Sequence, residues 1–164
     1  MPTSPLNQYL IGLGSNLGER GSLLSQARER IARDVGPVVA AARTYSTLPV
    51  GAADRTFLNS ALLVSTALAP RDLMLRLLAV EGALGRVRTV KWGNRTIDLD
   101  VLLWSPDGTP ATFEDDLVRI PHPHLLERDF ALVPAAEIAG SWIHPVSGLT
   151  LAEEVIRRRY SLSE

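Results

Sequence analysis

The chain is predicted to adopt an α+β fold, a ferredoxin-like βαββαβ core with a mostly antiparallel sheet. Two observations lead to this prediction. Strand-like and helix-like segments follow the order β-α-β-β-α-β up to residue 104, and further helical segments come after it. This split-βαβ order packs two helices on one face of the sheet. We expect the additional C-terminal helices to lie nearby.

The first elements are predicted from local sequence signals. An apolar run with two glycines predicts a strand at residues 9–14, and a loop at residues 14–18 follows it. Residues 22–34 carry apolar side chains at helical spacing, and the Gly-Pro dipeptide at 36–37 ends this helix. The loop at 14–18 could cradle a phosphate through its N–H groups, but it lacks the ending of a P-loop. A plain strand-to-helix turn is the stronger interpretation.

Two strands, at residues 38–45 and 57–66, are predicted next. A helix at residues 70–85 follows, because Pro70 suits a first turn and Gly85 suits a helix end. The remaining predicted segments are a strand at 96–104, a polar surface hairpin or insertion at 105–116, a helical stretch ending near 139 and a last helix at 151–159.

Length and composition limit the classes of protein. With 164 residues and 46% apolar residues, the chain is predicted to form a single domain over residues 1–164, with residues 1–8 as a flexible tail. The sequence contains no cysteine, which excludes thiolate catalysis and disulfides. A formal charge of −1 argues against nucleic acid as a partner, and no apolar run is long enough to span a membrane. We expect a cytoplasmic monomer.

Asp98 and Asp100 are the most informative residues of the sequence. They interrupt an otherwise apolar strand-like run and stand two positions apart, so their side chains are predicted to share one face. Burial and mutual repulsion both disfavour two carboxylates there, so a cation must offset the cost. Arg86 and Arg95 stand just upstream. Either these arginines form structural ion pairs with the aspartates, or the aspartates hold Mg²⁺ while the arginines hold phosphate.

Other candidate residues each have a plainer interpretation. His122 could contact phosphate or relay a proton, or it could be a loop histidine with a satisfied hydrogen bond. Trp92 could belong to a mobile lid or cover the core. Phe57 and Phe130 could be core residues or could stack on a flat heterocycle, with Asn59 recognising its polar edge. His124 and His144 are expected to be structural.

Taken together, these motifs resemble the 6-hydroxymethyl-7,8-dihydropterin pyrophosphokinase family of folate biosynthesis. The most specific block is Arg95-Thr96-Ile97-Asp98-Leu99-Asp100. The other matching blocks, in family order, lie at residues 12–18, 45–51, 57–59, 81, 85–88, 92–94, 121–122 and 128–130. Phe57 stands where some members have tyrosine, and Pro123 where some have tyrosine after the motif histidine.

The resemblance implies that ATP donates its β,γ-pyrophosphoryl group to the hydroxymethyl oxygen of the dihydropterin, with release of AMP. It implies two Mg²⁺ ions held by Asp98 and Asp100, with catalytic roles for both aspartates and for Arg86 and Arg95. The residues implied to bind the nucleotide are Glu81, Arg88, Trp92, His122 and Arg128. The residues implied to bind the pterin are Thr47, Val50, Phe57, Asn59 and Phe130.

Two other functions are alternatives to this one. A Mg²⁺-dependent nucleotide phosphohydrolase could use the same two carboxylates. A non-catalytic ferredoxin-like RNA-binding module is disfavoured by the near-neutral charge and the low aromatic content.

Overall fold

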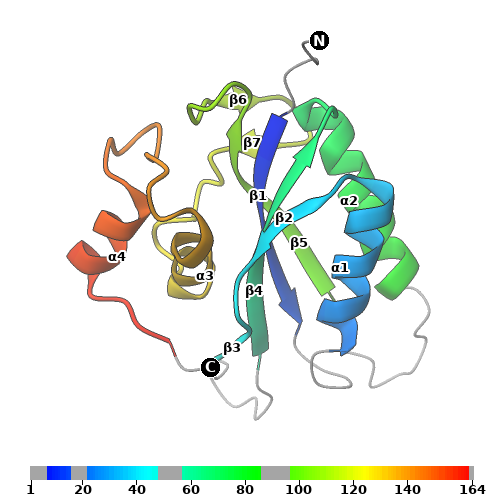
Figure 1. Cartoon of the computed structure of the whole chain (residues 1–164), viewed down its shortest axis with the longest axis horizontal. Helices are drawn as coiled ribbons and strands as arrows, with labels where there is room; N and C mark the ends of the chain where they lie inside the picture. The colour runs from blue at the N-terminus through cyan, green and yellow to red at the C-terminus, as the bar shows by residue number, and fades with distance from the viewer. Residues whose placement is uncertain (1–6, 16–21, 48–56, 86–96, 163–164) are drawn as a thin grey trace.

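The structure, a computed structural model, describes residues 7–15, 22–47, 57–85 and 97–162. Its centre is an antiparallel sheet in which β1 (Asn7–Ser15) lies between β4 (Phe57–Thr66) and β5 (Ile97–Ser105). Two short strands, β2 (Val38–Ala41) and β3 (Tyr45–Thr47), both pair with the other side of β4. The order β2-β4-β1-β5 confirms the predicted ferredoxin-like arrangement (Figure 1).

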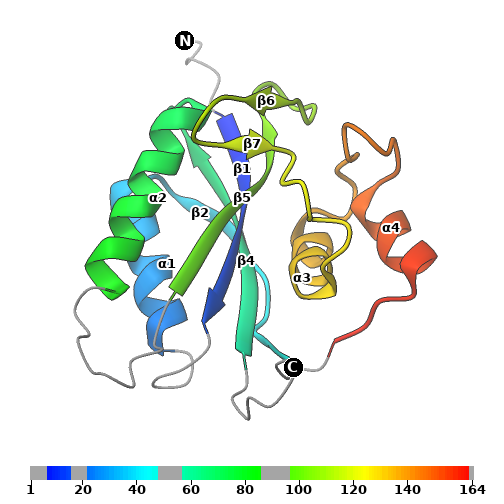
Figure 2. The same cartoon turned by 180° about the vertical axis from the view of Figure 1, so that it is seen from behind.

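Helices cover both faces of this sheet. α1 (Ser22–Asp34) and α2 (Pro70–Gly85) pack on one face, as the βαββαβ order predicted. α3 (Asp129–Ala139) lies on the opposite face, and α4 (Leu151–Arg158) packs outside α3, as both views show (Figures 1 and 2). Within the described ranges, no helix is long and apolar enough to cross a membrane.

Two apolar clusters hold these layers together. Between the sheet and α1 and α2, the buried side chains include Ile11, Ile31, Leu62, Leu77 and Leu99. Between the sheet and α3, they include Leu10, Leu63, Leu102, Leu125 and Leu132. The second cluster covers only part of its sheet face, because the strand ends beyond it carry the polar residues described below.

A hairpin follows β5, but it lies further along the chain than the predicted segment at 105–116, which includes only its first strand. β6 (Phe113–Glu114) pairs with β7 (Arg119–Ile120), and the Asp115 carboxylate accepts hydrogen bonds from the Leu117 and Val118 N–H groups in the turn between them. The chain then returns to the edge of β5, where the His122 N–H donates to the Leu102 carbonyl at 3.0 Å.

The start of the sheet differs from its prediction. Residues 7 and 8 belong to β1 and not to a tail, because Asn7 pairs with Thr66 and its side-chain amide donates to the Leu68 carbonyl at 3.1 Å. At the other end, β1 continues through Ser15, one residue beyond the predicted end at Gly14, so residues 14 and 15 do not lie in the predicted loop. The rest of the predicted loop, residues 16–18, lies outside the described residues.

The predicted strand at 38–45 is also wrong in one respect, because it is broken into β2 and β3. Between them, the Arg43 N–H points to the Glu137 carboxylate of α3, 3.2 Å from each oxygen, in place of a ladder partner. The strand is therefore interrupted by a contact with a residue 94 positions further along the chain.

Candidate active site

Asp98 and Asp100 project from one face of β5. Their neighbours Ile97, Leu99 and Val101 point into the cluster beneath α1 and α2. Because side chains alternate along a strand, both aspartates lie on the opposite face, the one that α3 partly covers. The Asp100 side chain keeps 46% of its surface exposed, and Asp98 is exposed. The two carboxylates are therefore side by side and accessible.

The strand register brings predicted residues into one row across the sheet. Gly14 of β1 is paired with Asn59 on one side and with Asp98 on the other, and Asn59 is paired with Tyr45 of β3. Directly paired residues point to the same face. The four residues Tyr45, Asn59, Gly14 and Asp98 thus form one row on this face. The row places the Asn59 amide, which is predicted to bind the pterin, on the same face as Asp98, the predicted metal ligand.

The absence of a side chain at Gly14 matters for the position of the Asn59 side chain. A Cβ atom at residue 14 would lie 3.2 Å from Asn59 Oδ1, closer than ordinary packing allows. Asn59 itself is 6% exposed, so its amide has little room to move away. The missing side chain at Gly14 therefore makes room for the amide.

Glu81 adds a third carboxylate near the aspartates. Its Oε2 accepts a hydrogen bond from the Leu99 N–H at 2.7 Å, which ties α2 to β5, the edge strand, between Asp98 and Asp100. Burial, followed by the Asp100 charge, raises the pKa of Asp98. Burial also raises the pKa of Glu81, with smaller contributions from both aspartates, against the opposing effect of the Leu99 hydrogen bond. A bound cation would relieve this repulsion.

The donor set suits a hard divalent cation. Among the described residues, no group of three or more histidine, aspartate or glutamate side chains is arranged to hold a metal ion. Asp98 and Asp100 supply two carboxylates. Mg²⁺ is commonly bound through one or two carboxylates, with phosphate oxygens and water completing its shell. The pair therefore fits Mg²⁺ delivered with a polyphosphate better than a site made of protein ligands alone.

His122 faces Asp100. Its Nδ1 accepts a hydrogen bond from the His124 N–H at 3.1 Å, which assigns the ring proton to Nε2, 3.9 Å from Asp100 Oδ1. Burial lowers the pKa of His122, and the Asp100 charge opposes that shift. Within the described part of the chain, His122 is the only basic side chain within 4.0 Å of either aspartate. The ring is poised to donate a hydrogen bond toward the aspartates.

Two large apolar side chains on this side of the molecule remain partly exposed. Phe57 points to the same sheet face as Asn59, and 36% of its surface is exposed. Phe130, in the first turn of α3, is 38% exposed, and the Arg128 guanidinium lies 5.8 Å from the centre of its ring. An aromatic face beside a cation suits a flat, electron-rich ligand.

Several predicted site residues cannot be placed. Val50, Arg86, Arg88, Trp92 and Arg95 lie outside the described residues. The backbone of Thr47 pairs with Phe57, but its side chain also lies outside the description. The choice between structural ion pairs and a metal site with phosphate-binding arginines therefore rests on the aspartates, Glu81 and His122.

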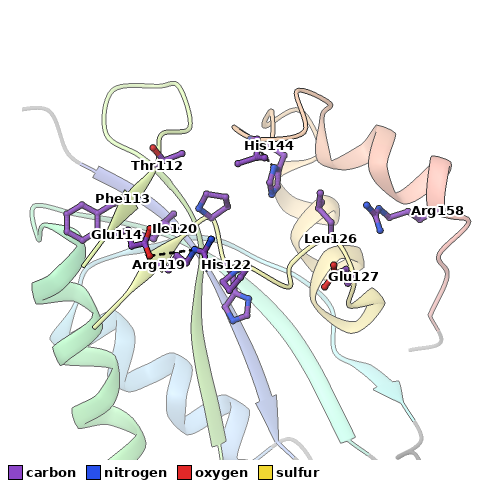
Figure 3. Close-up of a pocket in the computed structure, with 13 residues that line it drawn as sticks. Thr112, Phe113, Glu114, Arg119, Ile120, His122, Leu126, Glu127, His144 and Arg158 are labelled. Atoms are coloured by element: carbon purple, nitrogen blue, oxygen red, sulfur yellow. Dashed lines mark hydrogen bonds and ion pairs between the residues drawn. The ribbon is translucent and has the colours of Figure 1, made fainter. Parts of the chain in front are cut away.

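A cavity of about 600 Å³ lies next to this site and shares His122 with it. Figure 3 shows the cavity between the β6–β7 hairpin and the segment that carries His144 and Arg158. His122 is its only lining residue that was predicted to be functional. The remaining lining residues are Thr112, Phe113, Glu114, Arg119, Ile120, Pro121, Pro123, Leu126, Glu127, His144, Val146 and Arg158.

Sequence reasoning missed one contact on the same sheet face. The Tyr45 hydroxyl donates to Glu137 Oε1 of α3 at 2.6 Å, and Arg43 Nε donates to Glu137 Oε2 at 3.2 Å. Tyr45 and Glu137 are 92 positions apart, so no local pattern links them. Only the position of Tyr45 within a motif block could have drawn attention to it.

A ferredoxin-like sheet with paired carboxylates, an amide and exposed aromatic rings on one face has the features of a nucleotide-dependent transferase. Residues 10–140 match the family of 7,8-dihydro-6-hydroxymethylpterin-pyrophosphokinases (HPPK), and the chain belongs to this family. It is thus an ATP-dependent pyrophosphokinase of folate biosynthesis, which transfers the pyrophosphoryl group of ATP to hydroxymethyldihydropterin.

Individual relatives agree with this assignment. A 2-amino-4-hydroxy-6-hydroxymethyldihydropteridine pyrophosphokinase of Methylorubrum extorquens is 40% identical over 154 residues, which cover 93% of this chain and 94% of that protein. The enzyme of the same name from Bacillus subtilis is 40% identical over 134 residues, covering 80% of this chain and 78% of that protein.

Among solved structures, wild-type HPPK-DHPS of Plasmodium falciparum is similar with a TM-score of 0.71 at 12% sequence identity. The match covers 93% of this chain and 41% of that one, so this chain spans less than half of the longer protein. At this level of identity the likeness concerns the fold alone.

Proposed function

We propose that Asp98 and Asp100 would hold two Mg²⁺ ions, which accompany ATP. The single observation that supports this most strongly is their geometry, with two accessible carboxylates on one face of an edge strand. The raised pKa of Asp98 adds to this support, because burial and then the Asp100 charge disfavour its ionised form, which a bound cation would stabilise. When bound, Mg²⁺ neutralises charge on the triphosphate and orients it for in-line displacement.

We propose that the pterin binds beside this pair, stacked between Phe57 and Phe130. Asn59 would bond the polar edge of the ring with its one acceptor and its two donor hydrogens, together with the backbone around Thr47 and Val50. The row that joins Asn59, Gly14 and Asp98 supports this placement, because the hydroxymethyl group must reach the phosphate held at the aspartates.

The basic residues then have a shared role in charge stabilisation. Arg86 and Arg95 would stabilise the charge that develops on the transferring group. The nucleotide would be bound and oriented by Arg88, Trp92, His122, Arg128 and Glu81. His122 supports this scheme, since its Nε2, which carries the ring proton, lies 3.9 Å from Asp100 Oδ1. No nucleophilic side chain is needed for this transfer. Asp98 or Asp100 would accept the hydroxyl proton of the substrate, unless Mg²⁺, when bound, would make that hydroxyl more acidic.

The same proposal extends to the domain organisation, oligomeric state, location and partners of the protein. We propose a single pyrophosphokinase domain that acts as a cytoplasmic monomer on small molecules, without a nucleic-acid partner. The formal charge of −1 supports the last point, because nucleic-acid binding depends on a concentration of positive charge.

The products of ATP distinguish transfer from hydrolysis. The purified chain is incubated with Mg²⁺ and ATP, with and without 6-hydroxymethyl-7,8-dihydropterin, and nucleotides are separated by chromatography. AMP that forms only with the pterin, in equal amount to pyrophosphorylated pterin, supports the proposal. ADP or free phosphate that forms without pterin would instead show a phosphohydrolase.

A further inference from the structure

We propose that Tyr45 and Glu137 are positioning residues that hold the two sides of the pterin site at a fixed separation. One side is the β3–β4 pair, which carries Phe57 and Asn59. The other is the start of α3, which carries Phe130. This inference rests on the proposed function, since it assigns a role in binding the same pterin.

The contact is a cluster of donors around one carboxylate. Glu137 accepts from the Tyr45 hydroxyl at 2.6 Å, from Arg43 Nε at 3.2 Å, and from the Arg43 backbone N–H, 3.2 Å from each carboxylate oxygen. Hydrogen bonds to an ionised acceptor are shorter and stronger than neutral ones. The Glu137 side chain is 22% exposed and Tyr45 is 5% exposed, so solvent screens this contact less than it screens a surface ion pair.

Each partner is joined directly to a pterin-binding element. Tyr45 is the register partner of Asn59, and two residues further on Thr47 is paired with Phe57. Glu137 stands seven residues after Phe130 in α3, about two helical turns, so both residues lie on the same side of that helix. The contact therefore fixes the distance between Asn59 and the stripe of α3 that bears Phe130.

The electrostatics favour a permanently ionised acceptor. Burial acts to raise the pKa of Glu137, but the hydrogen bonds from Tyr45 and Arg43 outweigh it and the pKa is lowered. The carboxylate stays charged at neutral pH, and the contact persists throughout the working range of a cytoplasmic enzyme.

The test compares the same substitution at two buried tyrosines. Tyr45→Phe removes only the hydroxyl that reaches Glu137. Tyr9→Phe removes a hydroxyl that donates to the Leu68 carbonyl at 2.7 Å, and Tyr9 points into the cluster beneath α1 and α2, on the other side of the sheet. Steady-state kinetics with varied pterin and varied ATP, together with thermal unfolding, are measured for both variants and the wild type.

We expect Tyr45→Phe to raise the KM for the dihydropterin by about tenfold or more, the loss that one hydrogen bond to a charged acceptor corresponds to. The KM for ATP should stay within about twofold of the wild-type value. Tyr9→Phe should lower the melting temperature without changing either KM. Glu137→Gln, which keeps the shape and one acceptor oxygen, should fall between the wild type and Glu137→Ala in its KM for the pterin.

Two results would overturn this inference while leaving the proposed function intact. One is an unchanged KM for the pterin in an active, folded Tyr45→Phe variant. The other is an equal rise in the KM for pterin in Tyr9→Phe, since the effect would then follow stability alone. A wild-type chain that forms no AMP with the pterin would instead overturn the proposed function, and the inference with it.

Discussion

At the scale of single residues, the proposed chemistry depends on Asp98 and Asp100. Their placement follows from strand alternation, and the neighbours that point into the core leave no other face for them. Neither carboxylate contributes to the apolar core, and each repels the other. They are therefore expected to cost stability in the absence of metal and to be required for turnover in its presence.

Asp98→Ala should lower kcat by about a hundredfold or more, because one of the two metal ligands is lost. Its melting temperature without Mg²⁺ should equal or exceed that of the wild type, since a repulsive charge is removed. AMP release and thermal unfolding check both parts. Asp107→Ala, in the exposed turn after β5, is the matched control and should leave kcat unchanged. Near-normal turnover in a folded Asp98→Ala protein would refute the metal assignment.

Gly14 tests the position of the Asn59 amide. In Gly14→Ala the new Cβ would lie 3.2 Å from Asn59 Oδ1 and displace it, so the KM for the pterin should rise more than the KM for ATP. Gly12→Ala is the comparison, because its Cβ would meet the flexible end of Leu102 at 3.2 Å and not Asn59. Equal effects of the two substitutions on the pterin KM would contradict the assigned role of Asn59.

Several of the predicted site residues that the structure describes share one face of the sheet, among them Asp98, Asp100 and Asn59. Asp98 and Asn59 could be predicted from sequence because each stands on a strand with a clear pattern, whereas the contact of Gly14 with Asn59 depends on pairing between strands. The link between Tyr45 and Glu137 could not, since it joins residues 92 positions apart whose local sequences carry no matching signal. The partial exposure of Phe57 and Phe130 likewise depends on packing between distant segments.

At the scale of elements, local signals predicted the helices and long strands well. β4 (Phe57–Thr66) and α1 (Ser22–Asp34) have the predicted bounds, because apolar patterning and end signals agree there. The break between β2 and β3 was not predictable. It depends on the Glu137 carboxylate, which takes the Arg43 N–H out of the strand ladder.

The segment before α4 is held by a buried histidine. His144 is 5% exposed, and its Nδ1 accepts hydrogen bonds from the Val146 and Ser147 N–H groups at 3.2 Å. Burial lowers the pKa of His144, with Arg158 adding to the shift and Glu154 opposing it. The folded protein therefore binds this proton less readily than the unfolded chain does.

Stability should consequently fall as the pH drops below about 6.5, the pKa of an unperturbed histidine, because the unfolded state then gains protons first. Melting temperatures between pH 7.5 and 5.5 measure this slope. His122, whose pKa is also lowered, contributes with the same sign. The informative comparison is His144→Asn, which should be less stable at pH 7.5 but show a shallower slope. A slope identical to that of the wild type would exclude His144 as a source.

At the scale of the whole molecule, the sheet separates a stabilising layer from a functional one. The cluster beneath α1 and α2 is continuous along the sheet, whereas the opposite face is shared between the α3 cluster and the site residues. Packing of α3 thus contributes to stability and also fixes one side of the site.

Alanine substitutions at two fully buried residues, Leu132 and Leu77, test whether the two layers have different roles. Leu132→Ala, in α3, and Leu77→Ala, in α2, should each lower the free energy of unfolding by about 2–5 kcal/mol in urea titrations. Only Leu132→Ala should also weaken pterin binding, because it loosens the helix that carries Phe130. Equal loss of pterin affinity in the two variants would mean that the layers are not functionally distinct.

The most direct test of the central claim is calorimetric titration with a non-hydrolysable ATP analogue, with Mg²⁺ and with a chelator. The wild-type chain should bind the analogue much more tightly when Mg²⁺ is present, and Asp98→Ala/Asp100→Ala should show no such gain. If Mg²⁺ tightened binding equally in both proteins, the two carboxylates would not be the metal ligands.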